Sequence, residues 1–191
     1  MGTVVTTNSA TLVNKGLEVI DAHLLFDVPF DSIDVVVHPQ SIVHSMVEFA
    51  DGSTIAQASP PDMRLPISLG LDWPNRVPDV GVPLDWTVAQ SWTFEPLDAS
   101  AFPAVALAKR VGEAAGTYPA VFNAANEQAV TAFHAQRVGF LGILETVERV
   151  VDAHDPRDFL SDGELTLDGL LAAENWARDE ADRMLAAASN G

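Results

Sequence analysis

A short segment near the start of the chain gathers side chains that can bind an anion and a metal ion. Residues 8–18 (NSATLVNKGLE) combine hydroxyl and amide groups with one lysine and one glutamate. Residues three and four apart share a helix face, so Asn14 and Lys15 should lie beside Glu18, with Ser9 near the free amides of the helix N-terminus. The donors, the cation and the positive helix end suit a phosphate, and Glu18 suits one ligand of a hard divalent cation.

The same spacing has a simpler interpretation. Lys15 and Glu18 could form a solvated ion pair on an ordinary capped helix, which is common and contributes little. One carboxylate is not a complete metal site, and the chain has no cysteine, so further ligands must be oxygen or imidazole. His23, His134 and His154 have no partners at metal-ligand spacing. Spacing alone leaves both interpretations open.

Composition excludes several classes of function. The formal net charge is -17, from 10 basic and 27 acidic residues, which disfavours nucleic acids and acidic membranes as partners. No apolar run approaches the roughly 20 residues of a membrane span, and no signal peptide is recognisable. With 48% apolar residues and no cysteine, the chain is expected to fold around a core in the cytoplasm.

The elements that must position this segment are a helix and a small sheet. Apolar spacing predicts a helix over residues 11–26, with Ser9 or Thr11 as cap. A β-branched run predicts a strand at residues 33–37. Two further strands, predicted at residues 45–49 and 53–57, flank an Asp-Gly pair that favours a hairpin turn. We expect one small sheet with the helix against it.

The second half of the chain predicts helices. Residues 59–98 hold most of the prolines and three of the four tryptophans, which favours a stiff, ordered crossing segment with buried indoles. Helical periodicity then predicts a four-helix bundle. The predicted fold class is therefore α+β, with a small mixed β-sheet and helices followed by a C-terminal α-helical bundle. The expected divisions are a catalytic-domain portion, a crossing linker and the bundle, at residues 1–72, 73–98 and 99–191.

Six motifs occur in an order that resembles one enzyme family, the 1-deoxy-D-xylulose-5-phosphate (DXP) reductoisomerases. The resemblance covers essentially the whole chain, is most specific between Ser9 and Arg76, and weakens over the last 60 or so residues, where mainly helical pattern remains. The motifs are NSATLVNKGLE at 8–18, HPQSIVHSM at 38–46, ADGSTIAQ at 50–57, PDMRLP at 61–66, WPNR at 73–76 and FNAANE at 122–127.

The resemblance implies an NADPH-dependent enzyme that isomerises and reduces DXP to 2-C-methyl-D-erythritol 4-phosphate in non-mevalonate isoprenoid biosynthesis. It also implies a divalent cation, Mg²⁺, Mn²⁺ or Co²⁺. Ser9, Asn14 and Lys15 match positions that hold the sugar phosphate substrate, and Glu18 matches a metal ligand that also touches substrate. On this interpretation Lys15 and Glu18 are the catalytic pair.

Three further residues match cofactor or active-site positions of the family. Gly2 matches a backbone contact to the cofactor, Met63 could pack on the nicotinamide, and His44 could line the active site. His44 and Met63 also have structural interpretations, because a histidine beside a strand is often a satisfied structural residue and a methionine between prolines is often core filler.

Other polar residues of the motifs have structural interpretations. Asn123, Asn126 and Glu127 are expected at the start of a bundle helix, where capping explains asparagine. His38 is expected to cap the end of its strand. These four residues are therefore not assigned to the site.

The resemblance further implies that the N-terminal Rossmann domain of the family is absent. The chain has no glycine-rich strand–turn–helix fingerprint, and the family's other metal ligands lie upstream of the matched motifs. We therefore expect a C-terminal half, inactive alone and homodimeric through the small sheet. The alternative is a stand-alone module kept for dimerisation or partner binding.

Overall fold

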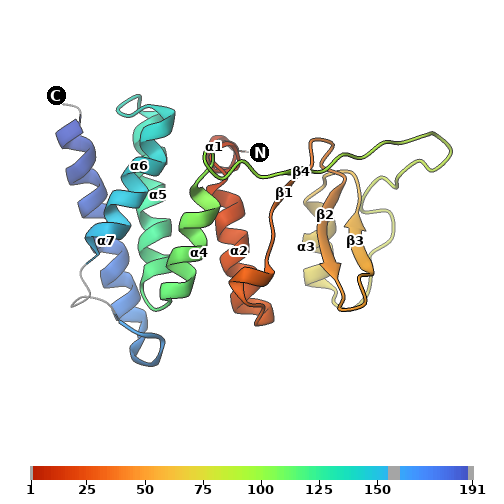
Figure 1. The fold of residues 1–191 in the computed structure, drawn as a ribbon, viewed down its shortest axis with the longest axis horizontal. Helices are drawn as coiled ribbons and strands as arrows, with labels where there is room; N and C mark the ends of the chain where they lie inside the picture. The colour runs from red at the N-terminus through yellow and green to blue at the C-terminus, as the bar shows by residue number, and fades with distance from the viewer. Residues whose placement is uncertain (1, 155–159, 189–191) are drawn as a thin grey trace. The chain divides into compact units, whose positions relative to one another are not determined.

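The computed structural model describes residues 2–154 and 160–188, which divide into two compact units (Figure 1). One unit, here called the helical unit, joins residues 1–34 to residues 98–191. The other, here called the strand unit, comprises Val35–Leu97. The predicted α+β fold class is confirmed. The expected divisions of this chain at residues 1–72, 73–98 and 99–191 stay a prediction.

Helices packed side by side form the helical unit (Figure 1). Helices α6 and α7 both pack on α5, α5 packs on α4, and α4 packs on α2. The apolar stripe of α6 is fully buried at Ile143, Val147 and Val150, a spacing that matches the 3.6-residue period of a packed helix. The helices are α1 (Thr3–Ala10), α2 (Val13–Phe26), α4 (Ala104–Ala114), α5 (Tyr118–His134), α6 (Phe140–Ala153) and α7 (Leu167–Ala188), with 3-10 turns η1 (Phe30–Ser32) and η2 (Asp162–Glu164).

The helix predicted over residues 11–26 begins at Val13 rather than at residue 11, and a separate helix precedes it. Helix α1 ends at Ala10, and α2 starts at Val13 after Leu12, whose φ of 60° is left-handed. The predicted caps Ser9 and Thr11 are wrong, because Leu12 is the N-cap and Ser9 lies inside α1. Helix α2 belongs to the helical unit and packs on α4, so its expected packing on the sheet stays a prediction.

The strand unit contains two antiparallel strand pairs and one helix. Strands β2 (Val43–Glu48) and β3 (Thr54–Ala58) form the predicted hairpin, with Gly52 at φ 83° in the turn. The strand predicted at 33–37 shortens to β1 (Val36–Val37), which pairs with β4 (Glu95–Pro96). The strands therefore form two separate two-stranded pairs rather than one sheet.

Helix α3 (Arg64–Leu71) lies in the segment predicted to lack periodicity. Its sequence, RLPISLGL, carries a proline in the first turn, which a helix tolerates. This helix is short and lies among prolines, so its apolar residues did not stand out as a helical pattern in the sequence. Pro66 therefore marks a helix start here rather than an irregular crossing segment.

Burial is concentrated in the helical unit. Among the described residues, every fully buried apolar side chain lies in this unit, and none lies in the strand unit. Trp73 and Trp86 are 74% and 73% exposed, so the expected burial of these two indoles is wrong. The strand unit thus presents large apolar side chains without an apolar core of its own.

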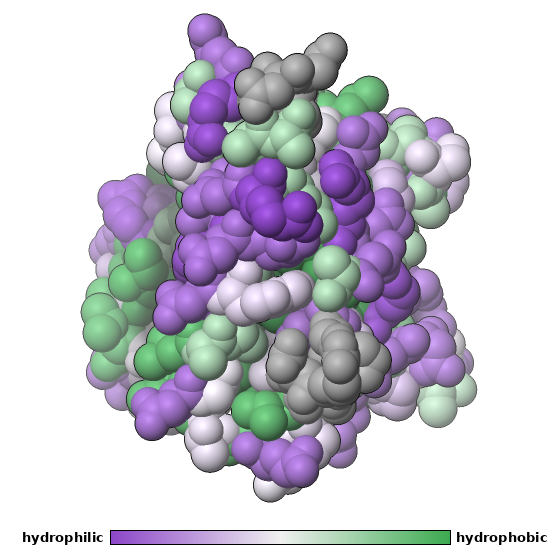
Figure 2. Space-filling model, turned by 90° about the vertical axis from the view of Figure 1, so that its left-hand side faces the viewer, coloured by the Kyte–Doolittle hydropathy of each residue, from purple (hydrophilic) through white to green (hydrophobic). Residues whose placement is uncertain are grey.

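Hydrophilic residues dominate the face that α7 presents (Figure 2). This face matches the acidic composition of the chain and is typical of a solvated helix. Within residues 2–154 and 160–188, no helix is both long and apolar enough to cross a membrane.

Candidate functional site

Three predicted site residues meet in the first turns of α2. Asn14 Nδ2 donates a hydrogen bond to Glu18 Oε1 at 2.8 Å, and Lys15 Nζ pairs with Glu18 Oε2. The predicted sharing of one helix face is therefore confirmed. The Lys15 and Glu18 side chains are 39% and 50% exposed, so both remain open to solvent and to a ligand. This arrangement can offer an anion a cation and an amide, and can offer a metal ion one carboxylate.

Ser9 lies on a different helix from the other three predicted residues. It lies one residue before the end of α1, and its carbonyl oxygen accepts a hydrogen bond from Leu12 N at 3.2 Å. The buried Thr11 closes α1, because its Oγ1 donates to Thr7 O at 3.2 Å and accepts from Val13 N at 3.4 Å. A left-handed turn, rather than one continuous helix, thus connects Ser9 to the cluster on α2.

Helix α1 is tied to α5 by two side-chain hydrogen bonds. Asn126 Nδ2 donates to Asn8 Oδ1 at 3.1 Å, and Thr7 Oγ1 lies 3.1 Å from His134 Nε2. Asn126 is 1% exposed. Two residues that spacing did not single out, Thr7 and Asn8, therefore fix the helix that carries Ser9.

The capping interpretation of the FNAANE motif is wrong. Asn123, Asn126 and Glu127 lie inside α5, which begins at Tyr118. Asn123 Nδ2 donates to Glu127 Oε1 at 3.0 Å, and Glu127 pairs with Arg178 of α7 at 2.7 Å. Asn126 instead points into the unit and binds α1. The motif therefore joins α5 to two other helices.

A close helix contact sets the position of α2. A Cβ atom at Gly16 would lie 2.7 Å from the Ala108 Cβ and 3.2 Å from the Ala104 carbonyl oxygen of α4. Only a glycine allows this approach without displacement, since real Cβ contacts are not this short. Gly16 lies between Lys15 and Glu18 in sequence, so the buried face of α2 is fixed directly behind the polar cluster.

Among the described residues, the second-rank candidates Gly2, His44 and Met63 make no hydrogen bond to this cluster. The Gly2 carbonyl accepts a hydrogen bond from Thr6 N at 3.1 Å, and the space around its Cα is open. His44 Nε2 lies 3.0 Å from Ser59 O, a contact that satisfies it structurally. Met63 is 70% exposed, so the core-filler interpretation is wrong. His44 and Met63 belong to the strand unit, and their approach to Glu18 stays a prediction.

The residues beside Met63 form a charged turn. The guanidinium of Arg64 hydrogen-bonds the Asp62 carboxylate and lowers the pKa of Asp62 from 3.8 to about 2. The backbone N of Arg64 also donates to Asp62 Oδ1 at 2.9 Å. Asp62 therefore stays ionised at the start of α3.

The remaining histidines make structural contacts. His38 Nδ1 lies 2.8 Å from Thr93 O, which ties the end of β1 to the residues before β4. His23 Nδ1 lies 2.8 Å from Val28 O, and buried His154 Nε2 lies 2.9 Å from Thr117 Oγ1. None of these contacts brings a histidine to the polar cluster.

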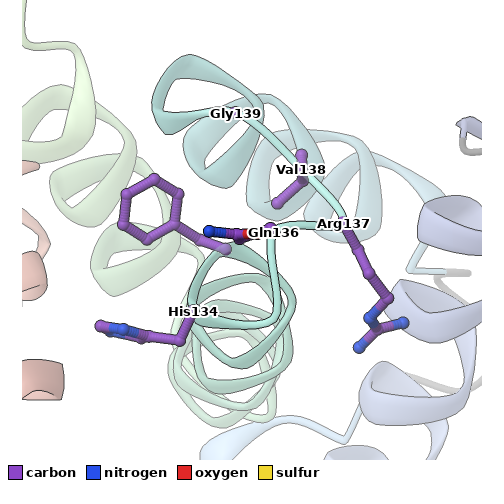
Figure 3. Close-up of a pocket in the computed structure, with 6 residues that line it drawn as sticks. His134, Gln136, Arg137, Val138 and Gly139 are labelled. Carbon is purple, nitrogen blue, oxygen red and sulfur yellow. The ribbon is translucent and has the colours of Figure 1, made fainter.

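An open pocket of about 590 Å³ occupies the α5–α6 turn (Figure 3). His134 and Arg137 leave this turn in opposite directions, so these two side chains do not converge (Figure 3). None of the residues predicted for the site lines this pocket. Within the described parts of the chain, no group of three or more potential ligands is placed to hold a metal ion.

The arrangement of units and motifs matches a known class of protein domain. A family model described as "DXP reductoisomerase C-terminal domain" matches residues 58–180. A second family model, described as "1-deoxy-D-xylulose 5-phosphate reductoisomerase C-terminal domain", matches residues 1–26. These matches include the polar cluster and parts of both units. The chain belongs to the DXP reductoisomerase family.

Curated relatives carry the same family name. The 1-deoxy-D-xylulose 5-phosphate reductoisomerase of Leifsonia xyli is 75% identical over 185 residues, which cover 97% of this chain and 50% of that protein. The reductoisomerase of Pseudarthrobacter chlorophenolicus is 65% identical over 99% of this chain and 47% of its own length. The chain thus spans about half the length of the curated relatives it matches.

Solved structures show the same fold. A reductoisomerase from Zymomonas mobilis in complex with NADPH matches with a TM-score of 0.87 and 42% identity over 95% of this chain and 47% of its own. A DOX-P reductoisomerase in complex with NADPH, fosmidomycin and magnesium matches with a TM-score of 0.91 and 34% identity over 97% of this chain and 47% of its own.

Proposed function

We propose that this chain supplies the phosphate-binding residues and one metal ligand of a DXP reductoisomerase. The reaction would isomerise 1-deoxy-D-xylulose 5-phosphate and reduce the product with NADPH to 2-C-methyl-D-erythritol 4-phosphate. The single observation that carries this proposal is the exposed contact of Asn14 and Lys15 with Glu18, at positions that match the family's substrate and metal residues.

Lys15, Asn14 and Ser9 have the chemistry to hold the substrate phosphate and its neighbouring hydroxyls. The ammonium provides charge, and the amide and hydroxyl provide directed hydrogen bonds at the N-terminal end of α2. Lys15 and Asn14 at present occupy both carboxylate oxygens of Glu18. A phosphate that attracts Lys15 would release Glu18 Oε2, so substrate binding would free an oxygen for the metal ion.

Glu18 can supply one ligand to a divalent cation, and a complete metal site would need further ligands. It is an exposed carboxylate, the donor type that Mg²⁺ and Mn²⁺ prefer, and the same chemistry suits Co²⁺. The other ligands would come from the half of the relatives that this chain does not span. A bound cation would polarise the ketone and hydroxyl oxygens of the substrate as a Lewis acid. Glu18 would supply one ligand to that cation, while Lys15 would hold the phosphate of the same substrate.

NADPH would contact this chain at few points. The Gly2 backbone and the exposed Met63 side chain match cofactor positions of the family, and His44 would line the same site. The described residues contain no parallel strand–helix–strand unit of the kind that binds dinucleotides. The nucleotide would therefore be held mainly by the other half of the enzyme.

We also propose that the strand unit forms a homodimer contact. Its hairpin exposes Met46, Val47, Phe49 and Ile55 by 45% to 65%, and the unit buries no apolar side chain fully. Apolar surface without a core is typical of an interface. The same surface supports the second candidate, a stand-alone dimerisation or partner-binding module. A cytoplasmic location stays a prediction from composition.

A fusion tests the main proposal. The first half of the Leifsonia xyli relative, joined to this chain, should oxidise NADPH when supplied with DXP and Mg²⁺, and we call this protein the fusion. This chain alone and the first half alone should show no turnover. A soluble, folded fusion without activity would contradict the proposed function, and turnover by the 191-residue chain alone would contradict its dependence on the other half.

A further inference from the structure

A buried asparagine of the bundle holds the helix that carries Ser9. Asn126 lies on α5 among fully buried neighbours such as Ala125 and Val130, and is itself 1% exposed. Its Nδ2 donates to Asn8 Oδ1 at 3.1 Å, a contact across 118 positions of sequence. The contact joins the core of the bundle to the residue directly before Ser9.

The contact fixes Ser9 relative to the rest of the cluster. Helix α1 is short, and it leads through the left-handed Leu12 into α2, which carries Asn14, Lys15 and Glu18. Gly16 seats α2 on α4, whereas α1 is tied to α5 by Asn126 and by the Thr7–His134 contact. Helix α1, which carries Ser9, and helix α2, which carries Asn14 and Lys15, are therefore held by different helices of the bundle. The Asn126–Asn8 hydrogen bond is the buried contact that holds α1.

The burial of Asn126 is not an optimal arrangement for stability. Its Oδ1 is buried and has no hydrogen-bond partner among the described residues. A buried amide oxygen without a partner is unfavourable, and an apolar side chain of similar size would remove that penalty. Such a side chain could not hold Asn8. The asparagine at position 126 therefore holds α1 in place at some cost to the stability of the fold.

We propose that Asn126 is a positioning residue for phosphate binding, acting through Asn8 on Ser9. The inference rests on the proposed function of the Ser9, Asn14 and Lys15 cluster. It assigns to the buried asparagine of the FNAANE motif a role in substrate affinity, whereas Asn123 of the same motif contacts only Glu127 within α5.

Asn126→Leu removes the donor of the Asn126–Asn8 hydrogen bond, on α5. Asn8→Leu removes the acceptor of the same bond, on α1, and leaves α5 unchanged. Asn123→Leu is the matched control, because it removes an asparagine hydrogen bond from the same helix without touching α1. In the 191-residue chain, hydrogen exchange of the α1 amides should accelerate at least fivefold in the first two variants and stay unchanged in the control. The melting temperature of Asn126→Leu should not fall.

In the fusion, KM for DXP should rise at least fivefold for Asn126→Leu and Asn8→Leu, with kcat and KM for NADPH within twofold of wild type. The double variant should be no worse than either single variant. Unchanged α1 exchange, a kcat loss in place of a KM rise, or additive single effects would each overturn the inference. Hydrogen exchange is measured without substrate and therefore does not depend on activity. An inactive wild-type fusion would count against the proposed function. The exchange rates of the α1 amides would still show whether Asn126 holds α1 in place.

Discussion

Glu18 is held by two neighbours that the proposed reaction would also use. Asn14 and Lys15 keep its carboxylate in one orientation before any ligand binds, which reduces the ordering needed when a metal ion arrives. Sequence spacing predicted this meeting, because i, i+3 and i, i+4 pairs follow directly from helix geometry. It could not predict the place of Ser9, since a non-glycine residue in the left-handed conformation, Leu12, separates the two helices.

Glu18→Gln in the fusion should weaken metal use more than substrate binding. The change removes one negative charge from the cation site while nearly preserving side-chain shape. The Mg²⁺ concentration for half-maximal rate should rise at least tenfold, and excess Mg²⁺ should restore part of the rate. A metal titration of steady-state NADPH oxidation measures this, and an unshifted titration curve would remove Glu18 from the metal site.

Lys15→Ala should give a different defect. It removes the cation proposed to hold the remote phosphate, and binding energy from that phosphate helps to orient the reacting end of the substrate. The kcat/KM for DXP should fall at least tenfold, about 1.4 kcal/mol of transition-state stabilisation, and excess Mg²⁺ should not restore it. Near-wild-type kcat/KM would instead support the solvated ion pair on an ordinary helix.

At the scale of the elements, helix position depends on close packing behind the site. Apolar periodicity predicted the helical bundle after the strand unit but placed the start of α5 near Asn126 rather than at Tyr118, and the Asp-Gly pair predicted the hairpin. Periodicity could not find that α2 packs on α4, because that contact depends on the missing side chain of Gly16 and on residues about 90 positions later. It also missed α3, whose first turn contains Pro66.

Gly16→Ala should destabilise the helical unit. Alanine favours the helix by about 1 kcal/mol, but its Cβ would lie 2.7 Å from Ala108 Cβ, and overpacking costs about 1–3 kcal/mol. We expect a net loss of about 1 kcal/mol in urea unfolding followed by circular dichroism. Gly70→Ala in α3 is the control, because nothing lies within 4 Å of its added Cβ. Equal stability of both variants would mean that α2 and α4 can separate freely.

The start of α3 should be insensitive to mild acid. The Arg64 guanidinium lowers the pKa of Asp62 to about 2, so the carboxylate's contribution to the helix start is complete above pH 3.8 and is lost as pH falls through about 2. A carboxyl titration by NMR should show this midpoint. Arg64→Met should move it back toward 3.8. A wild-type midpoint near 3.8 would show that the pair does not persist in solution.

On the scale of the whole molecule, the two units differ in what stabilises them. The helical unit buries Phe122, Ile143 and many smaller apolar residues, while the strand unit leaves many of its large apolar side chains exposed and buries none fully. Sequence composition predicted enough apolar residues for a core but not their uneven distribution, because it counts residues without placing them. The strand unit therefore has most to gain from a partner surface.

The chain should self-associate through the hairpin. Val47 and Ile55 are cross-strand partners, 57% and 65% exposed, and a lysine at Val47 would place a charge in the proposed contact. Val47→Lys should shift sedimentation at micromolar concentration toward the monomer. Leu141→Lys, at a position 73% exposed on α6, should leave the distribution unchanged. A wild-type monomer, or equal effects of both variants, would remove the hairpin from the interface.

The return of the chain to the helical unit has a consequence during protein synthesis. Helices α1 and α2 are made before their partners α4 and α5, which follow only after the whole strand unit, Val35–Leu97. At ribosomal rates of about 5–20 residues per second, the apolar face of α2 at Val13, Val19 and Ile20 would wait for several seconds before α4 arrives. The residues proposed to bind phosphate therefore belong to a segment that needs shielding on the ribosome.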